Sequence, residues 1–127
     1  MTTGGFKVFR VDERDSVTII APLGDAISFR GADVHGELKS IEETIDKHPS
    51  RDAIFDLGSV NYFGSIMIGM IISMAKRVNE HNRRAVLAAA STDMLRLLNA
   101  MQLCWMWAHF PTVKEALKTL KEADREA

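Results

Sequence analysis

The chain has 127 residues, of which 46% are hydrophobic and 26% are charged, a composition that argues against disorder. Its 16 basic and 17 acidic residues leave a formal net charge of -1, which predicts no long-range attraction to nucleic acid or to an anionic membrane. Cys104 is the single cysteine, which excludes an internal disulfide and is typical of a reducing compartment.

We expect one cytoplasmic domain over residues 1–127, with its core in residues 6–122 and a frayed C-terminal tail. No signal peptide is expected, because residues 1–5 are polar. The most apolar segment, residues 62–75, is too short to insert across a bilayer.

The first elements in chain order are a hairpin and a helix. Residues 6–11 alternate apolar and polar side chains, as in an edge strand, and residues 17–21 predict a second, more buried strand. The charged residues 12–15 predict an antiparallel turn between them. A helix follows, with Asp33 as its N-cap and Pro49 just beyond its end. Its apolar stripe consists of Val34, Leu38, Ile41 and Ile45.

The centre of the chain predicts a buried strand over residues 53–57, a loop, and a helix over residues 65–80 that stops at Asn82. The side of this helix that faces the core is predicted to carry Ile68, Ile71, Ile72 and Ala75. The opposite face carries Ile66, Gly69, Met70, Ser73 and Arg77. Because functional groups collect at the carboxyl edge of parallel strands, we expect the loop and this opposite face to carry the function.

The last part predicts a strand over residues 85–89, a helix capped by Ser91 or Thr92, and a brief strand within residues 105–110. The stripe of that helix is Met94, Leu97, Leu98 and Met101. Thr112 and Glu115 form a capping box that opens a final helix. The buried side of the final helix is expected to hold Val113, Ala116, Leu117 and Leu120.

The predicted order of elements is β-β-α-β-α-β-α-β-α. Strands that alternate with helices indicate an α/β fold with a mostly parallel sheet, to which the hairpin adds an antiparallel strand. We therefore expect a mixed sheet of four to five strands with about four helices.

Three stretches in this order resemble the STAS family of anti-sigma factor antagonists and related domains of sulfate transporters. They are residues 53–65 (AIFDLGSVNYFGS), residues 94–103 (MLRLLNAMQL) and residues 112–117 (TVKEAL). The family pattern is a strand ending in Asp-Leu, a loop, and Asp-Ser-Ser/Thr-Gly-Leu-Gly at the start of a helix. The resemblance implies a STAS-like fold and a regulatory, non-enzymatic module that binds a protein partner.

In the antagonists, the second hydroxyl residue of that motif is phosphorylated by an anti-sigma factor that is a serine kinase. When Gly69 is aligned with the last glycine of the motif, Ile66 takes the phosphoacceptor position and Gly64 takes the position of the aspartate. The resemblance therefore implies a degenerate phosphorylation site. Ser65 is the remaining candidate phosphoacceptor, although we favour a role as the helix N-cap.

Two interpretations of the surrounding residues stay open. Ile66 and Met70 either pack against a neighbouring element or a second copy of the chain, or form an exposed patch for docking. Asp56 is expected to make a structural hydrogen bond to the following loop. The full set of predicted partner-binding residues is Asn61, Gly64, Ser65, Ile66, Gly69, Met70, Ser73 and Arg77.

No residue pattern predicts an enzyme, a cofactor or a metal site. The four histidines are widely spread, and none forms a ligand pair at helical spacing. Cys104, Trp105 and Trp107 are expected to be buried or half-buried.

The sequence thus predicts an anti-sigma factor antagonist-like module in a partner-switching system that regulates sigma-factor-dependent transcription. Its partner would be a protein such as an anti-sigma factor serine kinase, not nucleic acid. The alternative is a STAS accessory subunit of a lipid or anion transporter complex. Whether the chain forms a homodimer is left open.

Overall fold

A computed structural model describes residues 8–23, 34–60, 65–102 and 107–126 of the chain. It contains a five-stranded sheet in the order β1-β2-β3-β4-β5. The strands are β1 (Phe9–Arg14), β2 (Val17–Pro22), β3 (Asp52–Asp56), β4 (Ala85–Ala88) and β5 (His109–Phe110). β1 pairs antiparallel with β2, and the other neighbours pair in parallel. The predicted mixed, mostly parallel sheet is confirmed.

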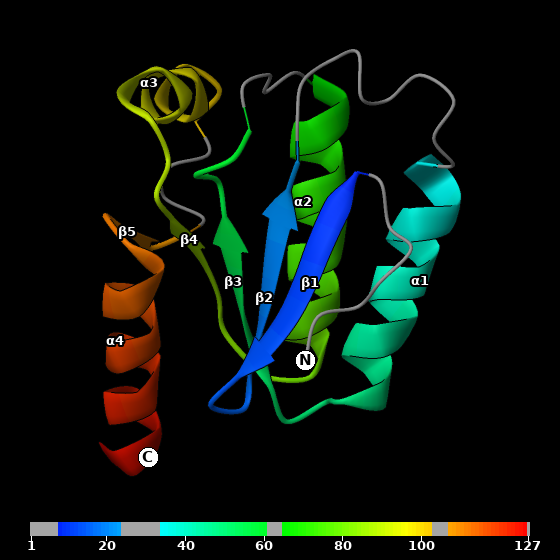
Figure 1. The fold of residues 1–127 in the computed structure, drawn as a ribbon, viewed down its shortest axis with the longest axis vertical. Helices are drawn as coiled ribbons and strands as arrows, with labels where there is room; N and C mark the ends of the chain where they lie inside the picture. The colour runs from blue at the N-terminus through cyan, green and yellow to red at the C-terminus, as the bar shows by residue number, and fades with distance from the viewer. Residues whose placement is uncertain (1–7, 24–33, 61–64, 103–106, 127) are drawn as a thin grey trace.

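The helices form unequal layers on the two faces of the sheet. They are α1 (Val34–Lys47), α2 (Ser65–Glu80), α3 (Thr92–Ala100) and α4 (Val113–Glu126). Figure 1 shows α1 and α2 side by side behind the sheet, α4 alone on the other side, and α3 beyond the upper end of the strands. The order of elements confirms the predicted α/β fold.

Each face of the sheet has its own apolar core. The larger core lies beneath α1 and α2 and contains Phe55, Met67 and Ile71 among its buried side chains. The smaller core is formed by α4 and includes Ile54 and Leu117. Alternation along β3 sends Ile54 to one core and Phe55 to the other, as expected for a strand covered on both faces.

The hairpin has a longer first strand and a shorter turn than the sequence predicts. β1 extends through the charged residues to Arg14, and only Asp15 and Ser16 form the turn, with φ values of 52° and 64°. Positive φ at both central residues of a two-residue loop is typical of a type I′ turn. The charges are accommodated in β1 because it is an edge strand, and Arg10 and Asp12 form an ion pair at 3.5 Å on it.

α2 has the predicted bounds, but its buried surface is wider than the predicted stripe. Met67, Met70, Met74 and Val78 are buried as well as Ile68, Ile71 and Ala75, whereas Ile72 is only partly buried. The reason is that α2 contacts both the sheet and α1, so two of its sides are covered. Asn82 has φ of 59°, which confirms the predicted left-handed stop.

Two buried carboxylates fix the ends of neighbouring elements, and neither role was predicted. Glu37 of α1 is 8% exposed, and its Oε1 accepts hydrogen bonds from the backbone N–H groups of Val8 at 2.9 Å and Phe9 at 3.3 Å. Asp52 at the start of β3 is 1% exposed and pairs with Arg83 at 3.1 Å and Arg84 at 2.8 Å. These contacts tie α1 to the edge strand and β3 to the start of β4.

α4 continues to Glu126, and the fraying expected for the C-terminal tail stays a prediction. The N–H of Glu115 donates to Thr112 Oγ1 at 3.1 Å, which confirms half of the predicted capping box. Within the part of the chain described here, no helix has the length and apolar character needed to cross a membrane.

Candidate functional site

The turn after β3 lies at the carboxyl edge of the sheet. The N–H of Gly58 donates to Asp56 Oδ1 at 3.0 Å, which confirms the structural hydrogen bond predicted for Asp56. A Cβ on Gly58 would lie 3.1 Å from Asp56 Oδ1 and 3.4 Å from Ala89 Cβ. The turn is therefore closely fitted against both the aspartate and the end of β4.

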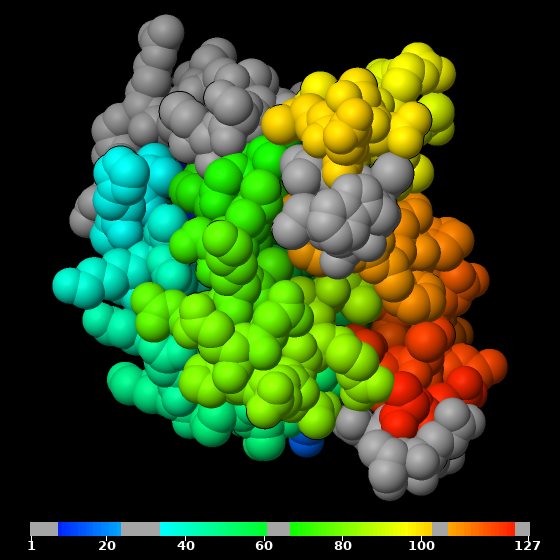
Figure 2. Space-filling model, turned by 180° about the vertical axis from the view of Figure 1, so that it is seen from behind, coloured from blue at the N-terminus to red at the C-terminus, as the bar shows by residue number. Residues whose placement is uncertain are grey.

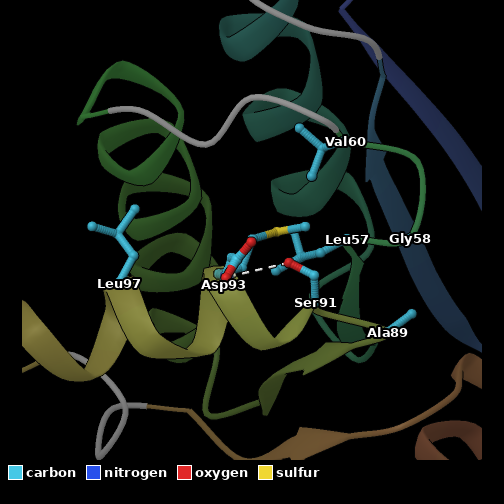
Figure 3. Close-up of a pocket in the computed structure, with 8 residues that line it drawn as sticks. Leu57, Gly58, Val60, Ala89, Ser91, Asp93 and Leu97 are labelled. Carbon is cyan, nitrogen blue, oxygen red and sulfur yellow. Dashed lines mark hydrogen bonds between the residues drawn. The ribbon is translucent and has the colours of Figure 1, made fainter.

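A cavity of about 440 Å³ opens between this turn and α3. Its lining residues come from the ends of β3 and β4 and from α3; they are Leu57, Gly58, Val60, Ala89, Ser91, Asp93, Met94 and Leu97. Figure 3 shows these side chains around the cavity, with a dashed line from the Ser91 hydroxyl. That hydroxyl accepts the N–H of Met94 at 3.1 Å, which confirms the predicted N-cap of α3.

The end of β4 has an unusual backbone. Ala89 has φ of 60°, a left-handed conformation that is costly for a residue with a Cβ. The strand beside it holds the segment in place, because the N–H of Ala89 donates to the carbonyl of Phe110 at 3.0 Å and the N–H of Ala90 donates to His109 Nε2 at 3.3 Å. Burial lowers the pKa of His109, and the neutral ring is the form that accepts this bond.

α3 departs from the prediction that its apolar stripe is buried. Leu98 is 1% exposed and Met94 is partly buried, but Leu97 is 38% exposed and Met101 43% exposed. The prediction was wrong for these two residues because α3 lies beyond the end of the strands and meets the core along one side only (Figure 1). Leu97 and Met101, one helical turn apart, form what we name the α3 apolar pair.

Of the residues predicted to lie on the outer face of α2, Gly69 and Met70 differ in exposure. Gly69 is exposed, and a Cβ placed there would meet nothing within 4 Å. Met70 is 5% exposed and belongs to the larger core, so it does not contribute to an exposed docking patch. Burial, the first of the two interpretations, therefore holds for Met70.

Ser73 and Arg77 face α1. The hydroxyl of Ser73 donates to Glu42 Oε2 at 3.3 Å, and Arg77 Nε donates to the same oxygen at 3.2 Å. Arg77 Nη1 also pairs with Asp46 at 2.9 Å. The nearby carboxylate of Asp46, followed by the hydrogen bond to Glu42, raises the pKa of Arg77. Both side chains lie at the surface between the two helices and already have partners there.

The remaining predicted residues are not placed. Asn61 and Gly64 lie outside the described residues, as do Cys104 and Trp105. α2 begins at Ser65, but the side chains of Ser65 and Ile66 are not described. Trp107 is 7% exposed and belongs to the larger core, as predicted. Among the residues that are described, no three histidine, cysteine or acidic side chains gather as metal ligands would.

The outward side of α2 and part of α3 belong to the same side of the molecule. Figure 2 shows α2 in the middle of the back face, between α1 and α3. Sequence reasoning placed Leu97 and Met101 in the core. The signal that could have identified them is the short length of α3, because nine residues offer little surface with which to cover a sheet.

Solved structures share this fold at low sequence identity. An anti-sigma-factor antagonist (STAS) domain protein from Planctomyces limnophilus is 22% identical with a TM-score of 0.66, covering 89% of this chain and 97% of its own. A candidate anti-sigma factor antagonist from Thermotoga maritima is 18% identical with a TM-score of 0.74, covering 89% and 94%. An anti-sigma factor antagonist from Mycobacterium paratuberculosis is 16% identical with a TM-score of 0.70, covering 89% and 92%.

The sequence itself matches a family model over most of its length. That model, described as the STAS domain, covers residues 9–116, from the edge strand β1 to the first turn of α4. The matched range contains the turn after β3, the cavity and the α3 apolar pair. The chain belongs to the STAS domain family.

Proposed function

We propose that this chain is a non-enzymatic regulatory module that docks to a protein partner, in the manner of an anti-sigma factor antagonist in a partner-switching assembly. The observation that carries the proposal is the α3 apolar pair, exposed beside a cavity at the carboxyl edge of the sheet. Large apolar side chains next to a concavity are a frequent feature of protein-binding surfaces. The sequence resemblance predicted the partner site on the loop before α2 and on the outer face of α2, so α3 adds a surface that the resemblance did not predict.

The proposed docking surface extends from α3 onto the start of α2. Gly69 supports this extension, because an exposed helical glycine with open space above it allows another backbone to approach closely. We include Asn61, Gly64, Ser65 and Ile66 at the centre of the surface on the basis of the family motif. Ser73 and Arg77 lie at its edge, where their contacts with α1 hold them in position.

We further propose that docking is not switched by phosphorylation of this motif, either at its usual position or at Ser65. Isoleucine at position 66 has no hydroxyl group to accept a phosphate, and Gly64 removes the acidic neighbour. Incubation with ATP and a cognate serine kinase, followed by mass spectrometry, tests this point. Phosphate on Ser65 would contradict it and would make Ser65 a phosphoacceptor as well as the first residue of α2.

Binding to a cognate anti-sigma factor kinase tests the docking surface. We expect Leu97→Asp and Met101→Asp each to weaken binding about tenfold or more, because a buried apolar contact becomes a desolvated charge. Leu97 is 38% exposed and Met101 43% exposed in the unbound chain, so each variant should lose no more than about 1 to 2 kcal/mol of stability and remain folded. Isothermal titration calorimetry measures the first quantity, and urea unfolding measures the second.

A matched control separates docking from a general effect of added negative charge. Thr119 is exposed on α4, on the other side of the sheet, and Thr119→Asp should leave binding unchanged. Unaltered affinity in both α3 variants would refute the proposed surface. Ile66→Asp is expected to weaken binding similarly, with stability within about 1 kcal/mol of the parent chain; strong unfolding would instead mean that Ile66 is part of the core.

A further inference from the structure

A second concave surface lies at the opposite end of the molecule from α3. It is a groove of about 510 Å³ between the end of the β1–β2 hairpin and α4. Figure 1 shows the turn of this hairpin and the C-terminal end of α4 at the lower side of the fold. We name it the basic groove; its lining residues are Arg14, Asp15, Lys114, Leu117, Lys118 and Lys121. Four of these six side chains are cationic, and one is a carboxylate.

The cations of the basic groove have no acidic partner among the described residues. Over the described ranges 8–23, 34–60, 65–102 and 107–126, no ion pair joins Arg14 or any of the three lysines to a carboxylate. Arg10, four residues before Arg14 on the same strand, does have such a pair with Asp12. The groove is therefore a local excess of positive charge on a chain whose net charge is only -1.

The floor of the groove is apolar. Leu117 is 9% exposed and belongs to the smaller core, while the charged side chains around it are exposed. A partner that enters would therefore meet charges at the rim and an apolar contact at the bottom. Among the six lining residues, no large apolar side chain projects outward as insertion into a membrane surface would require, since Leu117 lies recessed.

The lysines are regularly spaced along α4. Lys114, Lys118 and Lys121 fall at i, i+4 and i+7, so they follow one side of the helix over about 10 Å. A helical segment with carboxylates at the same spacing could place one opposite each lysine, and an apolar side chain between them would reach Leu117. Arg14 would bind from the hairpin side.

We propose that the basic groove binds an acidic segment of a protein partner, with carboxylates against Lys114, Lys118 and Lys121 and an apolar side chain over Leu117. The proposal does not depend on the function proposed above, since the groove shares no residue with the cavity beside α3. Because the two surfaces lie at opposite ends of the sheet, the chain could hold two partners at once and bridge them (Figure 1).

Fluorescence anisotropy with a labelled peptide tests the groove in the full chain. The probe is a helical peptide with glutamate at i, i+4 and i+7 and leucine at i+3, and its control replaces each glutamate with glutamine. We expect the glutamate peptide to bind and the glutamine peptide not to bind. Affinity should fall severalfold when the salt concentration rises from about 0.05 M to 0.3 M, because exposed charge pairs are screened.

Matched charge reversals locate the binding. Lys118→Glu with Lys121→Glu should weaken peptide binding about tenfold or more, since two attractions become repulsions. Lys39→Glu with Lys76→Glu changes the net charge equally at exposed positions on α1 and α2 and should leave binding unchanged. Circular dichroism melts check that both double variants fold.

Three results would overturn the proposal. The first is no binding of the glutamate peptide, and the second is an equal loss in both double variants, which would reveal a response to net charge alone. The third is binding to phosphatidylglycerol vesicles, but not to the peptide, that Lys118→Glu with Lys121→Glu abolishes. That result would assign the basic groove to an anionic membrane surface.

Discussion

Replacing Gly69 with alanine is expected to stabilise the chain. Gly69 lies in the interior of α2, where glycine is less favourable than alanine by roughly 0.5 to 1 kcal/mol. The added methyl group should not clash with a neighbour, because a Cβ at Gly69 would meet nothing within 4 Å. For a chain of this length, the gain should raise the melting temperature by about 2 to 5 °C, measured by differential scanning calorimetry or as a higher urea midpoint.

Gly58 supplies the matched control for this substitution. A Cβ at Gly58 would lie 3.1 Å from Asp56 Oδ1, so Gly58→Ala is expected to be neutral or destabilising. If Gly69→Ala lowers the urea midpoint, the space above Gly69 is filled in solution and the reasoning is refuted. Gly69→Arg extends the test to docking: it should fold as stably as Gly69→Ala and weaken partner binding about tenfold, since a long side chain would occupy the proposed surface.

Two further predictions concern stability. Glu37→Ala should lower the free energy of unfolding in urea by about 2 to 4 kcal/mol, because the buried N–H groups of Val8 and Phe9 lose their acceptor. Glu37→Gln retains an acceptor and should cost about 1 kcal/mol, so equal costs for the two variants would mean that the hydrogen bonds contribute little. Burial lowers the pKa of His109 from its ordinary value of 6.5, so the unfolded chain binds this proton more tightly than the folded chain. Stability should therefore be fully present above about pH 6.5 and fall as the pH drops towards the lowered value, and His109→Gln should flatten this dependence of the urea midpoint.

Local sequence patterns predicted the elements that are covered by the core. β3, α2 and the buried side of α4 agree with their expected positions, because a strand or helix with a continuous apolar surface has only one way to bury it. Side chains that act on their immediate neighbours were also predictable. Asp56 bonds two residues ahead and Ser91 caps its own helix, so neither contact depends on the rest of the fold.

The candidate site was less predictable, because exposure depends on where an element lies. Leu97 and Leu98 are adjacent leucines, and the sequence assigned both to the core. The position of α3 beyond the strands leaves one of them 38% exposed and the other 1% exposed. Met70 is the opposite case. The sequence left open whether Met70 is buried or exposed, and in the structure it is 5% exposed because α2 is covered by both the sheet and α1.

The sequence by itself determined the order of elements, the two-sided sheet and the STAS motif with isoleucine at position 66, since these follow from apolar periodicity and from residue identity. Only the tertiary structure decided which apolar residues of α3 reach solvent, and it brought Arg14 together with lysines about 100 positions later in the chain. The physical reason is that burial and charge density are properties of neighbours in space. A local sequence pattern does not specify which distant residues become neighbours when the sheet forms.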